Sequence, residues 1–159
     1  MKPPLTELGA FVSSKPSIGY IDVRVFAHAT EDPEKVLTAV RSILPEELGE
    51  GAVFRKTGLT GHHGNPIFLF ETRLVDKRLL PVVLRKFGGG LSVLDREALG
   101  SELKLHLEKR NLFLRFDKQS AFLGEVRFSQ NDPIRVKIHF KNKGFEEIVA
   151  ICRDAGLLP

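Results

Sequence analysis

Residues 112–141 contain three short runs in which apolar and polar residues alternate, separated by residues that favour turns. Because residues two apart share a face of a β-strand, these runs predict three strands that each have one apolar and one polar face. The last run divides into apolar Ile134, Val136, Ile138 and Phe140 and cationic Arg135, Lys137, His139 and Lys141. The chain is therefore expected to build a sheet with one apolar and one cationic face, and a polyanion would contact the cationic face.

The chain has the length and composition of one folded domain. Its 159 residues are 42% hydrophobic and 28% charged, which is typical of a globular chain rather than a disordered one. The single cysteine, Cys152, excludes an intramolecular disulfide and a multi-cysteine zinc site, which favours a reducing compartment. We expect an N-terminal arm of uncertain order at residues 1–16 and a single domain at residues 17–159.

Neither a membrane segment nor a secretory signal is evident. No apolar stretch approaches the roughly 20 residues needed to span a bilayer. Residues 1–19 contain proline and serine but lack the uninterrupted apolar core of a signal peptide. We therefore expect a cytoplasmic protein with no membrane partner.

Positive charge is concentrated in one part of the chain. Residues 101–143 carry ten Lys and Arg against five Asp and Glu, whereas the whole chain has a net charge of only +4. The remainder is therefore close to neutral. Charge gathered in one segment indicates a polyanion partner better than the total does.

The rest of the chain shows strand and helix patterns in turn. Strand patterns occupy 18–28, 52–57 and 66–74, and helical patterns occupy 33–44, 79–87, 92–109 and 145–152. Asp32 and Pro33 favour a helix start, and Gly88–Gly90 are expected to end a helix. Residues 103–107 also alternate like a strand, but we favour helix because Glu, Lys, Leu and Ala dominate there. This order predicts a single α+β domain with a mostly antiparallel sheet and helices packed on one face.

The loop Thr60–Pro66 contains adjacent histidines, His62 and His63, flanked by glycines. Three interpretations are open: a tight hairpin turn, a nucleic-acid contact and a metal site. The metal site is the weakest, because adjacent histidines suit one metal poorly and match no common ligand spacing. Further ligands would have to come from His28, Glu31 and Asp32, which also suit a helix cap.

The cationic strands are the main candidate binding surface. Phe113 shares a strand face with Arg115, so an aromatic ring would lie beside a cation, as in surfaces that bind nucleic acid. The alternative is the solvated face of an antiparallel sheet, which commonly carries Lys and Arg. Sequence alone leaves both open.

Four motifs together resemble an archaeal family of RNA-binding proteins that is described as exosome-associated. They are His28-Ala-Thr-Glu-Asp-x-x-Lys-Val36, Gly61-His-His-Gly-Asn-Pro-Ile67, Leu114-Arg-Phe-Asp-Lys-Gln119 and Asp132-Pro-Ile-Arg-Val-Lys-Ile138. The resemblance covers about residues 17–155. It implies a fold similar to the ribosomal protein that binds 5S rRNA, RNA binding, and a cytoplasmic role near RNA processing.

We therefore predict a non-enzymatic RNA-binding protein that needs no cofactor or metal, alone or as an accessory of the exosome or another RNA-processing assembly. The residues expected to contact phosphates are Arg115, Lys118, Arg127, Arg135, Lys137 and Lys141. The loop residues expected to add shape or base contacts are His62, His63 and Asn65.

Two other functions are compatible with the sequence. The basic sheet could dock an acidic protein or form a homodimer, without any role for RNA. Alternatively, His28, His62 and His63 could serve a metal-dependent hydrolase.

Overall fold

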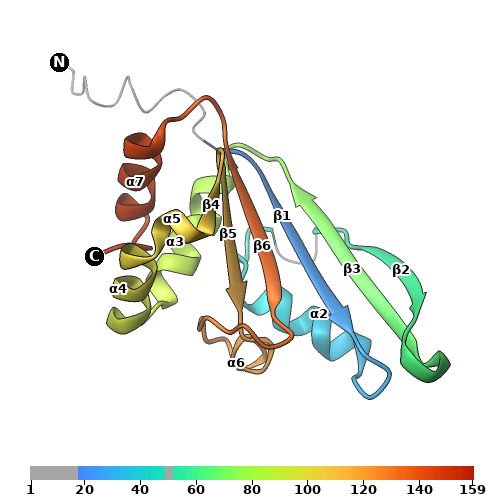
Figure 1. The fold of residues 1–159 in the computed structure, drawn as a ribbon. Helices are drawn as coiled ribbons and strands as arrows, with labels where there is room; N and C mark the ends of the chain where they lie inside the picture. The colour runs from blue at the N-terminus through green and yellow to red at the C-terminus, as the bar shows by residue number, and fades with distance from the viewer. Residues whose placement is uncertain (1–17, 49–51) are drawn as a thin grey trace.

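The computed structural model describes residues 18–48 and 52–159 (Figure 1). The predicted N-terminal arm at residues 1–16 lies outside the described residues. The described strands form one six-stranded antiparallel sheet in the order β2-β3-β1-β6-β5-β4. They are β1 (Ile18–Ala27), β2 (Arg55–Thr60), β3 (Pro66–Leu74), β4 (Leu107–Glu108), β5 (Asn111–Phe116) and β6 (Ile134–Phe140). The predicted α+β fold class is confirmed.

The strand registers align the apolar residues of neighbouring strands. Val23 of β1 pairs with Val136 of β6, which in turn pairs with Leu114 of β5. All three side chains are buried. The sheet therefore presents one continuous apolar face, as the alternation in each strand predicts.

Helices cover this apolar face (Figure 1). They are α2 (Pro33–Ser42), α3 (Leu80–Gly90), α4 (Val93–Ser101), α5 (Leu103–His106), α6 (Lys118–Phe122) and α7 (Phe145–Asp154). Phe87 of α3 packs on Phe116 of β5 with ring centroids 4.9 Å apart, which joins the helical layer to the sheet. None of the helices in residues 18–48 and 52–159 has the length and apolarity needed to cross a membrane.

The predicted start of the first helix is confirmed. Asp32 is the N-cap of α2, and its carboxylate accepts a hydrogen bond of 2.9 Å from the backbone N–H of Glu34. Pro33 follows at the first helical position, where its missing N–H costs nothing. This junction fixes the direction in which the chain leaves β1.

The prediction of three strands within 112–141 is wrong for the middle run. β5 and β6 form, but residues 118–122 make the short helix α6, and Phe128 makes only an isolated bridge to Phe116. Asp117 causes the change, because its carboxylate accepts from the backbone N–H and the hydroxyl of Ser120 at 2.9 and 2.7 Å. This cap starts a helix where the alternation predicts a turn.

α3 ends within the predicted run Gly88–Gly90, but at Gly90 rather than at the predicted Phe87. None of the three glycines adopts the left-handed conformation of a typical C-terminal glycine cap. Gly88 is buried against the backbone of Ala155 and Gly156, just after α7. Because glycine has no side chain, the backbone of α3 can approach the segment after α7 closely at this position.

The helical prediction for residues 92–109 is confirmed for most of its length. α4 and α5 occupy this segment up to His106, and the chain then enters the two-residue strand β4. β4 pairs with β5 through Leu107 and Leu112. The strand pattern at 103–107 thus corresponds to a real strand only at its end.

Candidate nucleic-acid interface

The second face of the sheet carries no described helix, and we call it the open face. Its central feature is an arginine row, Arg24, Arg135 and Arg115, on the adjacent strands β1, β6 and β5. Arg135 is the direct cross-strand partner of both Arg24 and Arg115. Like charges directly opposite each other destabilise a sheet, so the row is costly unless an anion lies over it.

Acidic side chains compensate only one end of the arginine row. Glu71 of β3 pairs with Arg24 at 3.1 Å and with Arg55 of β2 at 2.7 Å. Arg115 donates to the neutral amide oxygen of Gln130 at 3.0 Å. Among the salt bridges of the described residues, none involves Arg115, Arg135 or Lys137. The β5–β6 half of the open face therefore holds the uncompensated positive charge.

The side chains of the open face next to the arginine row contact one another in a fixed arrangement. Arg73 donates two hydrogen bonds, of 2.7 and 2.9 Å, to the carboxylate of Asp22. This Arg73 guanidinium also lies over the ring of Tyr20, 3.9 Å from its centroid. Tyr20 stacks on His139 at 4.8 Å, and Asn111 Oδ1 contacts Nδ1 of His139 at 2.9 Å. These contacts limit the freedom of the side chains that border the arginine row.

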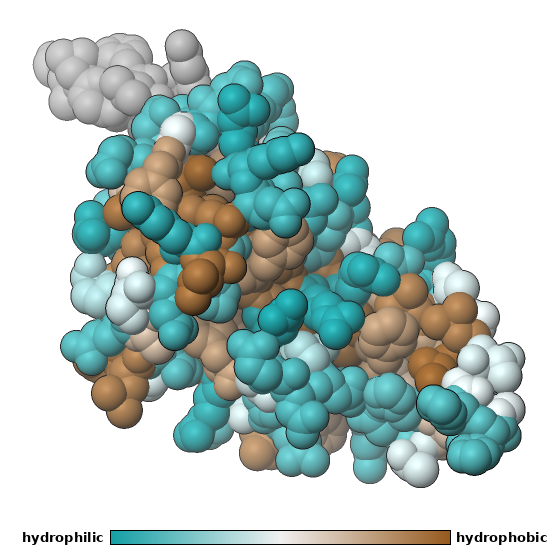
Figure 2. All heavy atoms as spheres, viewed as in Figure 1, coloured by the Kyte–Doolittle hydropathy of each residue, from teal (hydrophilic) through white to brown (hydrophobic). Residues whose placement is uncertain are grey.

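The open face is hollowed above β5 and β6. A hollow of about 450 Å³ is lined by Asp22, Arg24, Glu71, Phe113, Leu114, Arg115, Arg135, Val136 and Lys137. Phe113 remains 38% exposed on this surface. Figure 2 shows hydrophilic and hydrophobic side chains interleaved over these strands. Cations next to an exposed ring can take both the phosphate and the base of a nucleotide.

The other residues predicted to bind RNA lie away from this hollow. Arg127 is exposed beside Glu125, 3.6 Å from its carboxylate, and Lys141 is exposed just past the end of β6. His62, His63 and Asn65 are exposed at the turn between β2 and β3. The open face thus brings together Arg115, Arg135 and Lys137, whereas these other five residues lie outside its hollow.

The paired-histidine segment is a hairpin turn. β2 covers 55–60 rather than the predicted 52–57, which leaves only residues 61–65 between the strands. Gly61 and Asn65 close the turn through a backbone hydrogen bond of 2.7 Å. His63 and Gly64 adopt positive φ, at 59° and 75°. The turn interpretation is confirmed, and both imidazoles are exposed to solvent.

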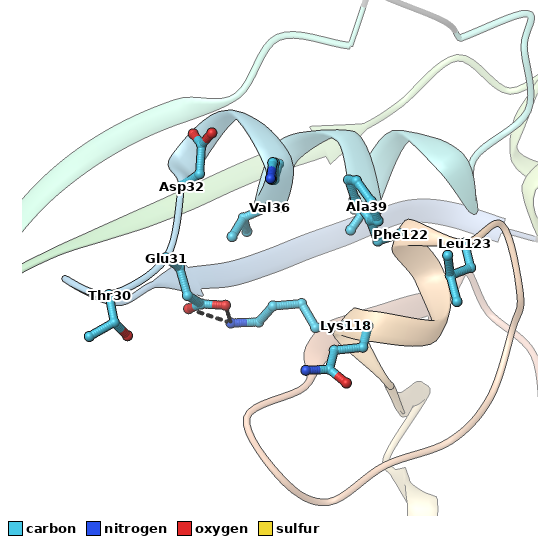
Figure 3. Close-up of a pocket in the computed structure, with 10 residues that line it drawn as sticks. Thr30, Glu31, Asp32, Val36, Ala39, Lys118, Phe122 and Leu123 are labelled. Atoms are coloured by element: carbon cyan, nitrogen blue, oxygen red, sulfur yellow. Dashed lines mark hydrogen bonds and ion pairs between the residues drawn. The ribbon is translucent and has the colours of Figure 1, made fainter.

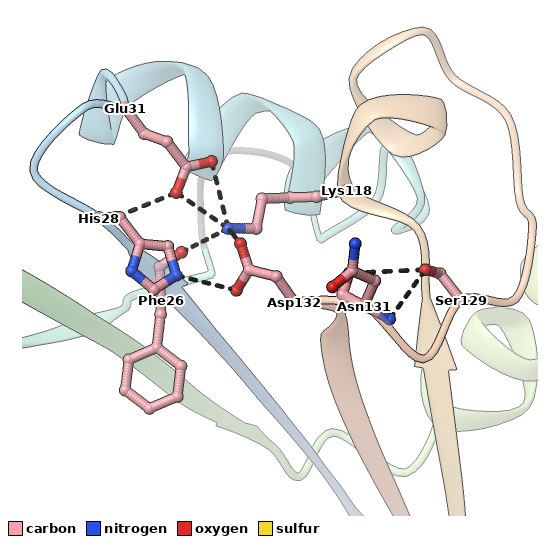
Figure 4. A network of polar contacts seen from close by, with 7 residues as sticks. All are labelled: Phe26, His28, Glu31, Lys118, Ser129, Asn131 and Asp132. Atoms are coloured by element: carbon pink, nitrogen blue, oxygen red, sulfur yellow. Dashed lines mark hydrogen bonds and ion pairs between the residues drawn. The ribbon is translucent and has the colours of Figure 1, made fainter.

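Lys118 is buried, with only 8% of its surface exposed. Its ammonium donates to Asp132 at 2.7 Å, to both carboxylate oxygens of Glu31 at 3.1 and 3.2 Å, and to the Phe26 carbonyl at 2.8 Å (Figure 4). Because these acceptors satisfy all the donors of the ammonium, this placement argues against the expected contact between Lys118 and phosphates.

The same cluster contains the one group of three metal-ligating side chains found in residues 18–48 and 52–159. Donor atoms of His28, Glu31 and Asp132 lie within 4.8 Å of one another. The Lys118 ammonium bonds to both carboxylates, so it already supplies the cation that they would otherwise need. His62 and His63 do not belong to this group. The arrangement therefore does not favour the predicted hydrolase site of His28, His62 and His63.

The cluster predicts a stability change at acid pH. Burial opposes ionisation of Asp132, but hydrogen bonds from Lys118 and His28 prevail and lower its pKa below the ordinary 3.8. A carboxyl group whose pKa is lower in the folded than in the unfolded protein stabilises the fold. This stabilisation is complete above the pKa of the unfolded state and is lost as the pH falls through the pKa of the folded state.

We therefore expect Asp132→Asn to reduce stability above about pH 4, by about 1 kcal/mol or less because Asp132 is partly exposed, and to matter less below it. Asparagine tolerates the positive φ of 47° at this position, so the backbone is not strained. Urea unfolding of the wild type and of Asp132→Asn at pH values above and below about 4 measures the effect. If the free energies of unfolding of the two proteins change with pH in parallel, the role of the carboxylate is contradicted.

A separate groove lies on the helical side of the molecule. It measures about 550 Å³, and Figure 3 shows Val36 and Ala39 of α2 facing Phe122 of α6 and Leu123 just after it. The Lys118–Glu31 ion pair closes its polar end. Apart from this ion pair, the charged residues of its lining are Asp32 and Lys35, which have opposite signs. The groove therefore offers mainly apolar contact rather than a cationic surface.

The open face defines the class of protein: an α+β domain whose antiparallel sheet leaves one cationic face uncovered. Residues 20–140 match the family model described as RNA binding, and the chain belongs to this RNA-binding family. The predicted membership of an archaeal RNA-binding family is thereby confirmed.

Individual relatives agree with this assignment. The chain is 37% identical over 140 residues to the RNA-binding protein PAB1135 of Pyrococcus abyssi, covering 84% of this chain and 90% of the relative. It is also similar to the crystal structure of AF2318 from Archaeglobus fulgidus, with 27% identity and a TM-score of 0.71. This match covers 87% of this chain and 99% of AF2318. The chain is also similar to the structure of Mth689, a DUF54 protein from Methanothermobacter thermautotrophicus, with 30% identity and a TM-score of 0.70. This match covers 90% of this chain and 99% of Mth689.

Three arginines of the open face were not predicted: Arg24, Arg55 and Arg73. The alternation in 18–28 places Arg24 on the polar face of its strand. Recognising it as part of the surface requires the strand order, which sets β1 directly beside β6.

Proposed function

We propose that this protein binds RNA through the open face of its sheet and acts without catalysing a reaction. The observation that carries the proposal is the arginine row, in which Arg135 lies opposite Arg24 and Arg115. Such a row is unfavourable in the free protein and becomes favourable when phosphates lie across it. Membership of the RNA-binding family supports RNA as the polyanion.

In this proposal Arg115, Arg135 and Lys137 make the first phosphate contacts, because no carboxylate pairs with them among the described residues. Guanidinium groups suit phosphates because they can donate two parallel hydrogen bonds. The residues outside the hollow that are proposed to extend the contact are Arg127, Lys141, His62, His63 and Asn65. A longer RNA would be needed to reach them.

A non-enzymatic role agrees with the state of the one cysteine. Cys152 is buried in α7, and burial raises the pKa of its thiol to about 12. A thiol in this environment stays protonated and is a poor nucleophile. We propose that it serves packing alone.

The finer biological role is also a proposal. The motifs that resemble an exosome-associated family support an accessory role in cytoplasmic RNA processing, either alone or with the exosome as partner. The same resemblance suggests likeness to the ribosomal protein that binds 5S rRNA. Co-purification of the tagged protein with RNA and exosome subunits tests the partner.

Salt dependence tests RNA binding through the open face. If Arg115, Arg135 and Lys137 each neutralise one phosphate, the slope of log affinity against log salt is about −2 for a single strand. Affinity should then fall roughly 16-fold between about 50 and 200 mM salt. Fluorescence anisotropy with a labelled RNA measures this slope, and a slope near zero would contradict the proposal.

A further inference from the structure

Phe113 is exposed on the open face, directly opposite Lys137 and two residues from Arg115. Resting on the function proposed above, we propose that Phe113 is a stacking platform for an unpaired base, which makes single-stranded RNA the ligand class of this face. The ring supplies contact to the base, and the neighbouring cations supply contact to the phosphates.

Phe113 is free to stack, in contrast to Tyr20 on the same face. The Tyr20 ring contacts Arg73, at 3.9 Å from the ring centroid, and His139, at 4.8 Å between centroids. Within the described part of the chain, Phe113 takes part in no ring–ring or cation–ring contact. Its exposed side therefore offers apolar surface that no other side chain already uses.

The hollow beside Phe113 has a suitable size and lining. Its volume of about 450 Å³ falls within the roughly 300–1,000 Å³ typical of small-ligand sites. Arg115, Arg135 and Lys137 line it together with Phe113. A nucleotide can thus place its base on the ring while its phosphate remains within reach of the cations.

This geometry favours an unpaired base over a duplex. In the interior of an RNA helix each base is paired and stacked on both sides, and the deep major groove is closed to side chains. The rings of a duplex therefore cannot lie flat on Phe113. A duplex could engage only the cations, whereas a single strand engages both the cations and the ring.

Replacing Phe113 by tryptophan gives a direct readout, because the chain contains no tryptophan. We expect the emission of Phe113→Trp to be quenched when an oligoadenylate of about twelve nucleotides binds, since the base stacks on the indole. We expect a blunt RNA duplex of the same length to leave the emission nearly unchanged. Equal quenching by both RNAs, or by neither while the oligoadenylate still binds, would overturn the proposal.

Phe113→Ala tests the energetic contribution of the ring. Affinity for the oligoadenylate should fall about 5- to 100-fold, with an unchanged salt slope and little change for the duplex. Phe122→Ala, which removes an exposed ring from α6 on the helical side, is the matched control and should bind as the wild type does. Thermal unfolding of each variant verifies the fold.

The outcomes separate this inference from the proposed function. If Phe113→Ala binds single strands normally while charge reversal of Arg135 and Lys137 abolishes binding, stacking is wrong and the RNA-binding face stands. If the wild type binds neither the oligoadenylate nor the duplex, both proposals are wrong.

Discussion

Charge reversal of Arg135 and Lys137 to glutamate should lower RNA affinity by about two orders of magnitude, because two phosphate contacts become two repulsions. Both residues lie on the open face of β6, and neither has an acidic partner within 4 Å among the described residues. Anisotropy titration with a single-stranded RNA measures the loss.

The same double variant should fold about as stably as the wild type. The substitution Arg135→Glu places an acidic group between Arg24 and Arg115, which replaces two like-charge pairs by two opposite-charge pairs. Lys137→Glu acts in the opposite sense, because it places a second carboxylate directly opposite Asp22 of β1. We expect the free energy of unfolding to change by no more than about 1 kcal/mol in either direction. Loss of binding with retained stability is difficult to explain by unfolding.

Arg85 and Lys86 provide a control with the same change in net charge. Both are exposed on α3, on the helical side of the sheet. Reversing both to glutamate should reduce RNA affinity only slightly, because they lie away from the open face. If both double variants lose affinity equally, net charge rather than the position of the cations on the open face governs binding. If neither loses affinity, the open face does not bind RNA, and a salt-insensitive dimer by light scattering would favour the protein-interaction alternative.

The sequence predicts the sheet faces well because alternation is a local property. In β6 the side chains repeat with a period of two, so Arg135 and Lys137 must share a face whatever the strand pairs with. The middle run failed because two hydrogen bonds that Ser120 donates to Asp117 start α6 at the turn before it, and the chain does not continue as a strand. Local capping is visible in the sequence, but its competition with a strand pattern is decided by tertiary packing.

The candidate site is less predictable, because its members depend on strand order and distant partners. Lys118 looks like another cation of the basic segment, yet Glu31 lies 87 residues away in sequence and pairs with it. Arg24 stands 111 positions before Arg135, and only the pairing of β1 with β6 makes them neighbours. Charge in a sequence therefore does not distinguish a free cation from one held in an ion pair.

Gly88→Ala should destabilise the protein by about 3 kcal/mol, toward the upper end of the cost of overpacking a core. A Cβ at Gly88 would overlap the carbonyl oxygen of Ala155 and lie 2.7 Å from the carbonyl carbon of Gly156. Both neighbours are backbone atoms of a turn that Gly156 fixes with a φ of 87°. The chain can relieve the overlap only by moving α7 away from α3.

Gly89→Ala is the matched control, one residue further along α3. A Cβ there meets nothing within 4 Å, so alanine should stabilise the helix by about 0.5–1 kcal/mol. Urea unfolding measures both changes. Equal effects at the two positions would show that helix propensity, rather than the contact with Ala155, determines the result. The contact between Gly88 and Ala155 lies on the helical side of the sheet, away from the open face. Folded Gly88→Ala should therefore keep the RNA affinity of the wild type. This result would separate the role of the helical layer in stability from that of the arginine row in binding.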